Sequence, residues 1–330
     1  MTKTIAIIDG DIICYRAAAA NETRSIKATH KTDGHEIVCP HRTAFKAQIK
    51  GAFEPEEFDV VDVQTPEDIS HAIHSMKGTI QRLKDACNAD EVELYLGGKN
   101  NFRDSLPLPT QYKFGRSDTL RPLQLKECRE YLVKHQGAIV VDNFEADDML
   151  AIRCTEGLKQ GIKTIACTLD GDANGVAGWL YNWNKHTEPF LIKGFGEINL
   201  NDKRNDFDGY GRKFFYAQWV YGDWGTDKFK PIDLAGKSFG VVAMYDLLKD
   251  CKNDKEAVEA VLRQYKAWYY PKGRSLDEKI EYDDWQGNPQ AFTLVQFMDM
   301  YAAACHMKRS EDDVFSTEKL LNNLGINWKE

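Results

Sequence analysis

Short apolar runs alternate with amphipathic stretches along the first two thirds of the chain. The apolar, β-branched runs have the length and composition of buried strands, since parallel strands are covered on both faces. They cover residues 4–8, 92–96, 137–142, 161–168, 179–183 and 188–193. Between them, apolar residues recur at helical spacing. These helical stretches cover residues 12–20, 66–88, 122–135 and about ten residues after Asp148. Strands that alternate with helices predict an α/β fold with a central, mostly parallel sheet and flanking helices.

Two further patterns bear on domain organisation. Residues 23–50 predict a hairpin around the turn signal Lys31–Gly34. The His and Cys residues there fit no zinc-ligand spacing, so a plain hairpin is the interpretation. From about residue 210 the pattern is mostly helical, interrupted by a glycine-punctuated stretch at 221–240. We predict an α/β core over residues 1–200 and a mostly helical part over residues 201–330.

Acidic residues follow three of the predicted strands. They are Asp9 and Asp11 after the first strand, Glu145, Asp147 and Asp148 after the 137–142 strand, and Asp170 and Asp172 after the 161–168 strand. In α/β sheets, sites form at the carboxyl ends of the strands. Three acidic groups far apart in sequence should therefore converge at one edge, although acids in a first helical turn also complement the helix dipole.

The chemistry of these side chains predicts a hard metal. About seven carboxylates at one edge cannot all stay ionised without a cation. The set contains no His or Cys, which favours oxygen-ligated Mg²⁺ or Mn²⁺ over Zn²⁺. Two such ions can support in-line displacement at phosphorus.

Charge is unevenly distributed along the chain. The 330 residues carry a formal net charge of −8, which counts mildly against a nucleic-acid binder. However, the segment Lys99–Lys134 contains eight basic and four acidic residues, a net charge of +4. A basic segment beside an acidic metal site fits the hydrolysis of a phosphodiester in a polyanion.

Other features place the protein in a cellular context. Eight cysteines without a C-x-x-C pair indicate reduced thiols in a cytoplasmic protein. No apolar run is long enough to span a bilayer, so no membrane association is expected. The N-terminus enters a strand pattern at once and is not a signal peptide.

Two partial motifs indicate other functions. The sequence Asp9-Gly10-Asp11 after an apolar strand matches the D-x-D of haloacid-dehalogenase-type phosphatases, but Ile13 stands where that motif has Thr or Val. The stretch Asp170–Gly175 resembles the first half of an EF-hand loop, but Tyr181 occupies the position of the bidentate Glu. The phosphatase motif also leaves Asp170, Asp172 and the basic segment without a role, and predicted strands instead of helices flank the EF-hand-like stretch.

The order of the motifs resembles the 5′-nuclease superfamily of flap endonucleases and 5′→3′ exonucleases, closest to its bacteriophage members. The resemblance reaches to about residue 250 and rests on an ordered set of residues. These are Ile8-Asp9, Tyr112-Lys113-x-x-Arg116, Glu145-Ala-Asp-Asp148, Asp170-x-Asp172 and Gly222-Asp223. It implies a PIN/5′-nuclease-like fold with a helical arch or clamp at about residues 99–134 and a degenerate helix-hairpin-helix in the C-terminal part.

The resemblance also implies a role for each matching residue. One metal ion is surrounded by Asp9, Glu145, Asp147 and Asp148, and a second by Asp170, Asp172 and Asp223. Lys113 and Arg116 engage the scissile phosphate, while Tyr112 stacks on an unpaired base or packs internally. Further DNA contacts are expected from Arg121, Gly236 and Lys237.

Departures from the family pattern concern the metal site. The second acid of the Gly222-Asp223 motif, Asp227, stands one position late, and Gly97-Gly98 occupies a position where many members carry an acid. Asp227 could reach the site through a bulged backbone, and Asp11 could replace the missing acid.

The resulting prediction is a monomeric nuclease that uses two Mg²⁺ or Mn²⁺ ions. Its predicted substrates are DNA duplex ends, flaps or nicks, with the RNA of RNA–DNA hybrids as a further candidate. Its predicted location is the cytoplasm, which is that of the host cell if the gene is a phage gene. The alternatives are a decayed nuclease fold that binds DNA ends or junctions without cutting, and a PIN-like ribonuclease.

Overall fold

The chain folds into two compact units, each built from segments that are separate in sequence. The computed structural model describes residues 3–329 except 117–119, 202, 204 and 224–228. The first unit comprises Met1–Asp9, Arg82–Thr119 and Ala138–Glu330, and the second Gly10–Gln81 and Leu120–Gly137. This division differs from the boundary near residue 200 that the sequence predicts, because the C-terminal helices pack with the sheet-bearing segments.

The first unit contains a six-stranded sheet in the order β6-β5-β1-β7-β8-β9. Its strands are β1 (Thr4–Asp9), β5 (Glu91–Gly97), β6 (Ile139–Val141), β7 (Lys163–Cys167), β8 (Gly178–Tyr181) and β9 (Phe190–Ile192). All neighbouring pairs are parallel except β8 and β9. The mixed α/β fold with a mostly parallel sheet is thus confirmed. The chain moves outward from β1 to β5 and β6, then returns to β7 on the other side of β1. This reversal is the switch point at which α/β folds place their sites.

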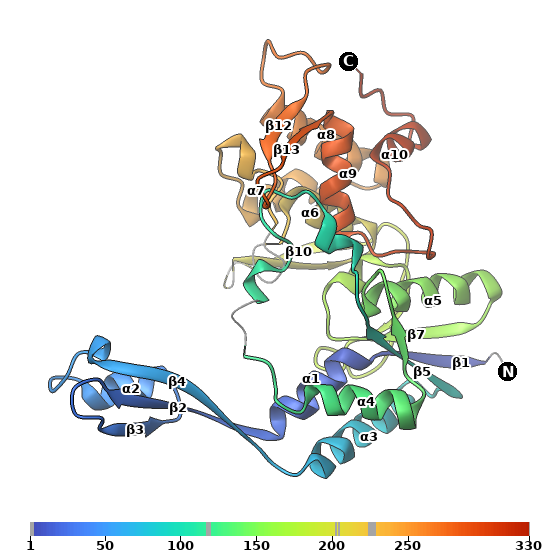
Figure 1. The fold of residues 1–330 in the computed structure, drawn as a ribbon. Helices are drawn as coiled ribbons and strands as arrows, with labels where there is room; N and C mark the ends of the chain where they lie inside the picture. The colour runs from blue at the N-terminus through green and yellow to red at the C-terminus, as the bar shows by residue number, and fades with distance from the viewer. Residues whose placement is uncertain (1–2, 117–119, 202, 204, 224–228, 330) are drawn as a thin grey trace. The chain divides into compact units, whose positions relative to one another are not determined.

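Helix α5 (Ala146–Gln160) packs across β1, β5 and β7 (Figure 1). Its apolar side chains join those of the strands in a buried cluster that includes Ile7, Leu150 and Leu180. The helix ends at Gly161, whose φ of 70° is the left-handed conformation that favours glycine at a helix terminus. Since α5 is fixed on the sheet, its first turn lies at the carboxyl ends of the strands.

The predicted arch segment differs from expectation in its described part. Between β5 and α4 (Leu125–Gln136) it forms two short 3₁₀ turns, Phe102–Ser105 and Phe114–Arg116, and no described α-helix. Pro107 and Pro109 lack an N–H donor and disfavour a helical conformation in the residues before them. A basic composition alone does not specify a helix.

The C-terminal part of the first unit is built around a large aromatic and aliphatic core. Its helices are α6 (Arg212–Tyr221), α7 (Val241–Leu248), α8 (Asp254–Tyr269), α9 (Leu294–Cys305) and α10 (Thr317–Asn323). Helix α6 packs against α7, α8 and α9. Two hairpins were not predicted from the sequence: β10 (Glu197–Asn201) with β11 (Asp206–Tyr210), and β12 (Ile280–Asp283) with β13 (Pro289–Phe292).

The second unit combines helices with a separate antiparallel sheet. The helices are α1 (Gly10–Ala20), α2 (Arg42–Ile49), the first part of α3 (Ile69–Ala86) and α4. The predicted hairpin is present as β2 (Glu22–His30) and β3 (Glu36–Cys39), and an unpredicted strand β4 (Phe58–Pro66) pairs with the other side of β2. Helix α2 covers one face of this sheet through a small core that includes Phe45 and Phe58 (Figure 1).

Two general properties complete the description of the fold. All eight cysteines are free thiols, as predicted. Among the described residues, no helix is long and apolar enough to cross a membrane.

The close contact between Gly157 of α5 and Thr164 of β7 leads to a first prediction. A Cβ atom at Gly157 would lie 2.3 Å from Oγ1 and 2.6 Å from Cγ2 of Thr164. Gly157→Ala should therefore lower the free energy of unfolding by about 1–3 kcal/mol through overpacking, although Ala alone raises helix propensity by about 1 kcal/mol. Urea unfolding measures the change.

A second substitution serves as the control. Thr164→Ala removes both clashing atoms, so Gly157→Ala combined with Thr164→Ala should be more stable than Gly157→Ala alone. A Gly157→Ala protein that is more stable than the wild type would mean that α5 and β7 are not in close contact.

Candidate active site

The ends of β1 and β7 are joined by a chain of hydrogen bonds. The Thr168 hydroxyl donates to the Asp9 carboxylate at 3.2 Å, and both residues are buried. The Asp170 N–H donates to the Thr168 hydroxyl oxygen at 3.1 Å, and the Asp172 N–H donates to the Asp170 carboxylate at 3.0 Å. The loop after β7 is thereby folded back toward the end of β1. Thr168 was not predicted as a site residue, because an isolated Thr at a strand end has no distinctive pattern.

Glu145, Asp147 and Asp148 occupy the start of α5. Glu145 is the N-cap residue, and its N–H donates to the Asp148 carboxylate at 3.2 Å. This is the reciprocal arrangement of a capping box, which satisfies otherwise unpaired donors of the first turn. Glu145 and Asp148 therefore cap the helix, and the same turn carries the predicted metal ligands.

Asp147 lies where several carboxylates act on one another. Burial, and then the negative charges of Asp170, Asp9 and Glu145, raise the pKa of Asp147 well above its usual value, while Lys113 opposes the shift. Among the described residues, its carboxylate accepts no hydrogen bond and forms no ion pair. The predicted convergence of acids from three strand ends is thus reflected in the electrostatics of one side chain.

Asp148, the next residue, has the opposite environment. Its carboxylate is fully buried and accepts two hydrogen bonds from the Arg103 guanidinium, at 2.5 and 2.9 Å. Burial alone raises the pKa of Asp148, but the hydrogen bonds and charge of Arg103 outweigh it and hold that pKa below its usual value. The metal role predicted for Asp148 stays a prediction, and in this structure both oxygens of its buried carboxylate are bonded to Arg103.

Glu145 is held by groups from the segment after β5. Lys113 forms an ion pair with it, the Asn101 side-chain amide donates to it at 3.0 Å, and the Tyr112 hydroxyl donates at 3.4 Å. The φ of Lys113 is 58°, which is uncommon for a residue with a side chain. The structure thus places the predicted phosphate-binding lysine beside the predicted metal ligands.

Tyr112 does not fit the stacking interpretation. Its side chain is 4% exposed and belongs to the core of the C-terminal part. A base cannot stack on a ring that is covered by protein, so the packing alternative raised from the sequence is the one the structure supports.

Asp172 and Asp223 form a second acidic region. Gln218 of α6 donates to the Asp172 carboxylate at 2.5 Å. Burial, followed by the charges of Asp172 and Asp223, raises the pKa of the Cys305 thiol well above its usual value, although Arg103 opposes them. Both carboxylates therefore lie within electrostatic range of one buried thiol.

The backbone conformation next to Asp223 explains why residue 222 is a glycine. Gly222 has a φ of 81°, and a Cβ there would lie 2.2 Å from the carbonyl oxygen of Phe229. The Asp223 N–H donates to the same carbonyl at 3.0 Å. Only glycine fits this close approach. Asp227 and the side chain of Arg116 lie outside the described residues, so their predicted roles stay predictions.

Two predicted residues in the second unit have other partners. Asp11 forms an ion pair with Arg129 of α4. Arg121 is exposed, and its carbonyl oxygen accepts a hydrogen bond from the Gln64 side chain. The suggestion that Asp11 replaces a missing acid finds no support in this contact.

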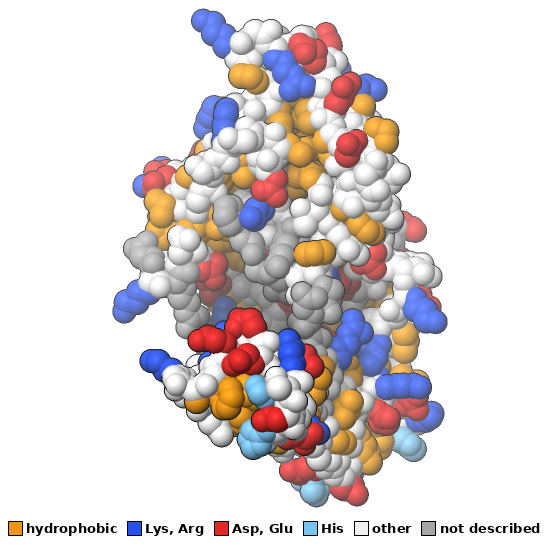
Figure 2. Space-filling view, turned by 60° about the vertical axis from the view of Figure 1, so that its left-hand side comes forward, with side chains coloured by type: hydrophobic (Ala, Val, Ile, Leu, Met, Phe, Trp, Pro, Cys, Tyr) orange, Lys and Arg blue, Asp and Glu red, His pale blue; other side chains and the backbone are white. Residues whose placement is uncertain are grey.

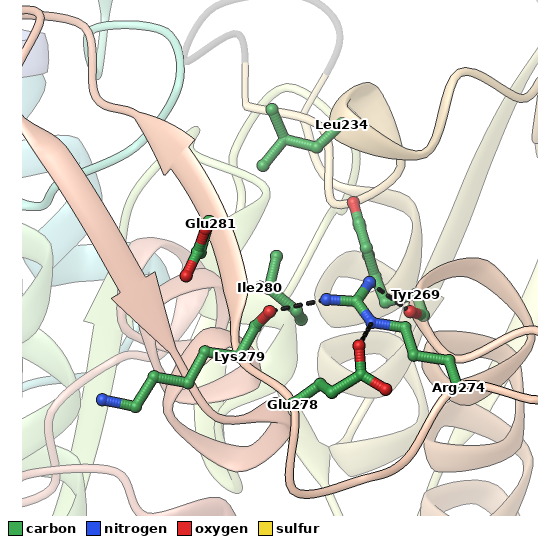
Figure 3. A pocket seen from close by; sticks show the side chains of 7 residues that line it. All are labelled: Leu234, Tyr269, Arg274, Glu278, Lys279, Ile280 and Glu281. Atoms are coloured by element: carbon green, nitrogen blue, oxygen red, sulfur yellow. Dashed lines mark hydrogen bonds and ion pairs between the residues drawn. The ribbon is translucent and has the colours of Figure 1, made fainter.

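The degenerate hairpin region contains Gly236 and Lys237. Gly236 ends a 3₁₀ turn, Asp233–Ala235, with a φ of 60°, and Lys237 donates to the Ala267 carbonyl at 3.1 Å. A pocket of about 400 Å³ lies close by, lined by residues that include Leu234, Tyr269 and Arg274 (Figure 3). Arg274 donates to backbone carbonyls of Tyr269 and Lys279 and lies 3.7 Å from Glu278. Its guanidinium is thus engaged with the protein on three sides.

The surface of the antiparallel sheet in the second unit is not a basic patch. Figure 2 shows Asp and Glu side chains beside Lys, Arg and His on this part of the molecule. Ion pairs join Lys27 of β2 to Glu36 of β3 at 2.6 Å, and Arg42 of α2 to Asp62 of β4 at 2.7 Å. Such balanced charge does not indicate a phosphate-binding surface.

Within the described part of the chain, no three Asp, Glu, His or Cys side chains enclose a metal site as they stand. The donor chemistry nevertheless fits a hard cation, because the clustered groups are carboxylates and the charge around Asp147 is repulsive. Binding of an ion would require these side chains to close around it.

No protein-family model and no curated protein matches the sequence of this chain. The chain is similar to solved structures of bacteriophage T5 nucleases. A variant of the T5 5′-exonuclease matches at 12% identity and a TM-score of 0.47, over 98% of both chains. The bacteriophage T5 flap endonuclease in a complex with DNA and metal ions matches at 12% identity and 0.46, again over 98% of both chains. T5 5′-exonuclease with bound zinc matches at 14% identity and 0.45, over 98% of this chain and 88% of that chain.

These structures come from the family that the motif order resembles. At 12–14% identity and TM-scores below 0.5, the likeness carries no conclusion about what this chain does.

The repulsion at Asp147 generates a prediction about stability. In EDTA at pH 7, Asp147→Asn should raise the free energy of unfolding, because it removes the charge that burial and the neighbouring carboxylates of Asp170, Asp9 and Glu145 oppose. The same change at the exposed Asp250 is the control and should have little effect.

Thermal unfolding with added Mg²⁺ completes this experiment. Mg²⁺ should stabilise the wild type, because a ligand that binds only the folded state stabilises it, and it should stabilise Asp147→Asn much less. If Mg²⁺ raised the unfolding temperature of both proteins equally, Asp147 would not be a metal ligand.

Proposed function

We propose that this protein is a metal-dependent 5′-nuclease that hydrolyses DNA phosphodiester bonds, as a 5′→3′ exonuclease or flap endonuclease. The observation that carries the proposal is the environment of Asp147. Burial and three neighbouring carboxylates work against its negative charge, and a divalent cation is the partner that relieves such repulsion. The ordered motifs of the sequence, which resemble the 5′-nuclease superfamily, supply the reaction class.

The metal ligands follow from the two acidic regions. Asp9, Glu145, Asp147 and Asp170 would hold one Mg²⁺ or Mn²⁺ ion. A second ion would be held by Asp172 and Asp223, with Asp227 as a further candidate. When bound, such ions supply a hydroxide at neutral pH and stabilise the leaving oxygen.

Protein side chains would position these ligands and the substrate. Thr168 donates to Asp9 and thereby orients its carboxylate. Lys113 carries the positive charge that lies closest to Glu145. An ammonium group can make a charge-assisted hydrogen bond to a phosphate oxygen and stabilise charge that develops there. Lys113 is therefore the residue we assign to the scissile phosphate, with Arg116 as its partner from the same motif.

The substrate class follows from the same features. We propose duplex ends, flaps or nicks as the DNA substrates and a monomeric enzyme in the host cytoplasm. The RNA of an RNA–DNA hybrid is a further candidate, since phosphate contacts do not depend on the sugar.

A second candidate function is DNA binding without cleavage. Its support is the position after β5, where many superfamily members carry an acid. A Cβ at Gly98 would lie 2.2 Å from Oδ1 of Asp142 and 2.7 Å from the carbonyl oxygen of Val141, so no side chain fits there. Together with the engaged Asp148, this leaves fewer carboxylates for metal binding than the motif order implies.

One cleavage assay separates the two candidates. The wild type should cut 5′-labelled flap and duplex DNA in Mg²⁺ and not in EDTA, and Asp147→Ala should abolish cleavage while DNA binding survives. A wild type that binds DNA and cuts no DNA or RNA in Mg²⁺ or Mn²⁺ would establish the binding function instead.

Lys113 provides a test of the phosphate contact. Lys113→Ala should slow single-turnover cleavage at least about tenfold, since a hydrogen bond to a charged group contributes about 1.5–3 kcal/mol. Lys99→Ala, at an exposed position of the same basic segment, is the matched control. Equal cleavage rates in the two variants would mean that Lys113 makes no specific contact with the scissile phosphate.

A further inference from the structure

Arg103 is a fully buried cation that joins three separate segments. Its side chain is 1% exposed and comes from the 3₁₀ turn after β5. Besides its two hydrogen bonds to Asp148, it donates to the carbonyl oxygens of Ala304 at 3.2 Å and His306 at 2.7 Å. A buried charge is tolerated only when it is paired and hydrogen-bonded. Arg103 therefore ties the first turn of α5 to the chain that leaves α9.

The chain after α9 forms a loop that also contacts Asp148 directly. The Lys308 N–H donates to Oδ1 of Asp148 at 3.0 Å. The loop is braced by His306, whose ring nitrogen lies 2.9 Å from Asp313, and by the Arg309 N–H, which donates to Asp313 at 2.8 Å. The bond from His306, followed by the Arg309 N–H and charges, lowers the pKa of Asp313 to about 2. The loop is thus held in shape independently of the acidic helix.

The contacts of Asp148 account for its whole hydrogen-bonding capacity. An ionised carboxylate has about four lone-pair sites. Asp148 accepts two bonds from Arg103, one from the Lys308 N–H and one from the Glu145 N–H. Asp147 accepts none among the described residues, although it is the adjacent residue on the same helix. Asp147 and Asp148 are therefore adjacent in sequence but differ in their hydrogen-bond contacts.

We infer that Asp148 is not a metal ligand but a positioning residue, which together with Arg103 docks the first turn of α5 onto the loop His306–Asp313. This inference rests on the proposed function. It makes the segment after α9 part of the scaffold of the active site. Docking fixes the start of α5 and with it the place of Asp147, and small misplacements of catalytic groups can cost about 100-fold in rate.

A double-substitution cycle tests the inference. Mn²⁺ affinity is measured without DNA, by electron paramagnetic resonance, in Arg103→Met, Asp148→Asn and the double variant. If Asp148 acts only through its pairing with Arg103, adding Asp148→Asn to Arg103→Met should change the affinity by less than about twofold, because residues that act as one unit are non-additive. Asp147→Asn should weaken Mn²⁺ binding in both backgrounds.

The metal-ligand alternative predicts the opposite. Removal of Arg103 would free Asp148 to bind the ion, so Arg103→Met would tighten Mn²⁺ binding. Asp148→Asn would then weaken it in the Arg103→Met background as strongly as Asp147→Asn does. Either result would overturn the inference.

Single-turnover cleavage supplies the second readout. Arg103→Met and the double variant should both lose about 100-fold in rate. Arg153→Met is the matched control, because Arg153 makes a similar two-bond pair with Glu93 farther along α5, at 2.7 and 2.8 Å. That variant should retain a rate near that of the wild type. If Arg153→Met lost as much rate as Arg103→Met, the pair between Arg103 and Asp148 would contribute only to overall stability. That result would contradict the inference.

A neutral variant covers the case in which Arg103→Met fails to fold. Arg103→Met with Asp148→Leu removes both charges of the buried pair, and such replacements are often well tolerated. Its Mn²⁺ affinity should stay closer to that of the wild type than the affinity of Asp147→Asn does, and an affinity as low as that of Asp147→Asn would contradict the inference. Because Mn²⁺ binding needs no substrate, a wild type that binds Mn²⁺ without cutting DNA would refute the proposed function alone.

Discussion

Repulsion among carboxylates at the carboxyl ends of β1, β6 and β7 is the constraint on which the site depends. A parallel sheet brings these strand ends to one edge, and the sequence places acids at each of them. Two adjacent carboxylates at this edge, Asp147 and Asp148, have opposite electrostatic environments. Asp148 is paired with Arg103 inside the protein, whereas burial and the carboxylates of Asp170 and Asp9 disfavour a negative charge on Asp147. The pKa values of two adjacent aspartates thus move in opposite directions, and the environment of Asp147 is the one in which we propose that a cation binds.

Much of this edge could be predicted from the sequence, because it depends on local patterns. The continuous apolar runs identify β1, β5 and β7, and an acid at a strand end follows from its position in the chain. The pairing of Arg103 with Asp148 could not be predicted, since the two residues are 45 positions apart and nothing local distinguishes Arg103 from the other basic residues around it. Strand β4 and the β12–β13 hairpin were missed for a related reason. Polar residues interrupt their apolar patterns, and pairing with distant strands decides their conformation.

The C-terminal part acquires a role from these contacts. A division into a nuclease core and a separate DNA-binding part was the natural expectation from the helical pattern after residue 210. Instead, the large aromatic core and the loop His306–Asp313 belong to the same compact unit as the parallel sheet. On the proposed function, residues after α9 would influence catalysis through the position of α5.

The central claim is that Asp9, Glu145, Asp147 and Asp170 bind a divalent metal ion while Asp148 does not. Anomalous diffraction from crystals grown with Mn²⁺ tests it most directly. The account predicts an anomalous peak coordinated by oxygens of Asp9, Glu145, Asp147 and Asp170, with Asp148 still bonded to Arg103. A peak coordinated by Asp148 with Arg103 displaced, or no peak at this edge at saturating Mn²⁺, would contradict it.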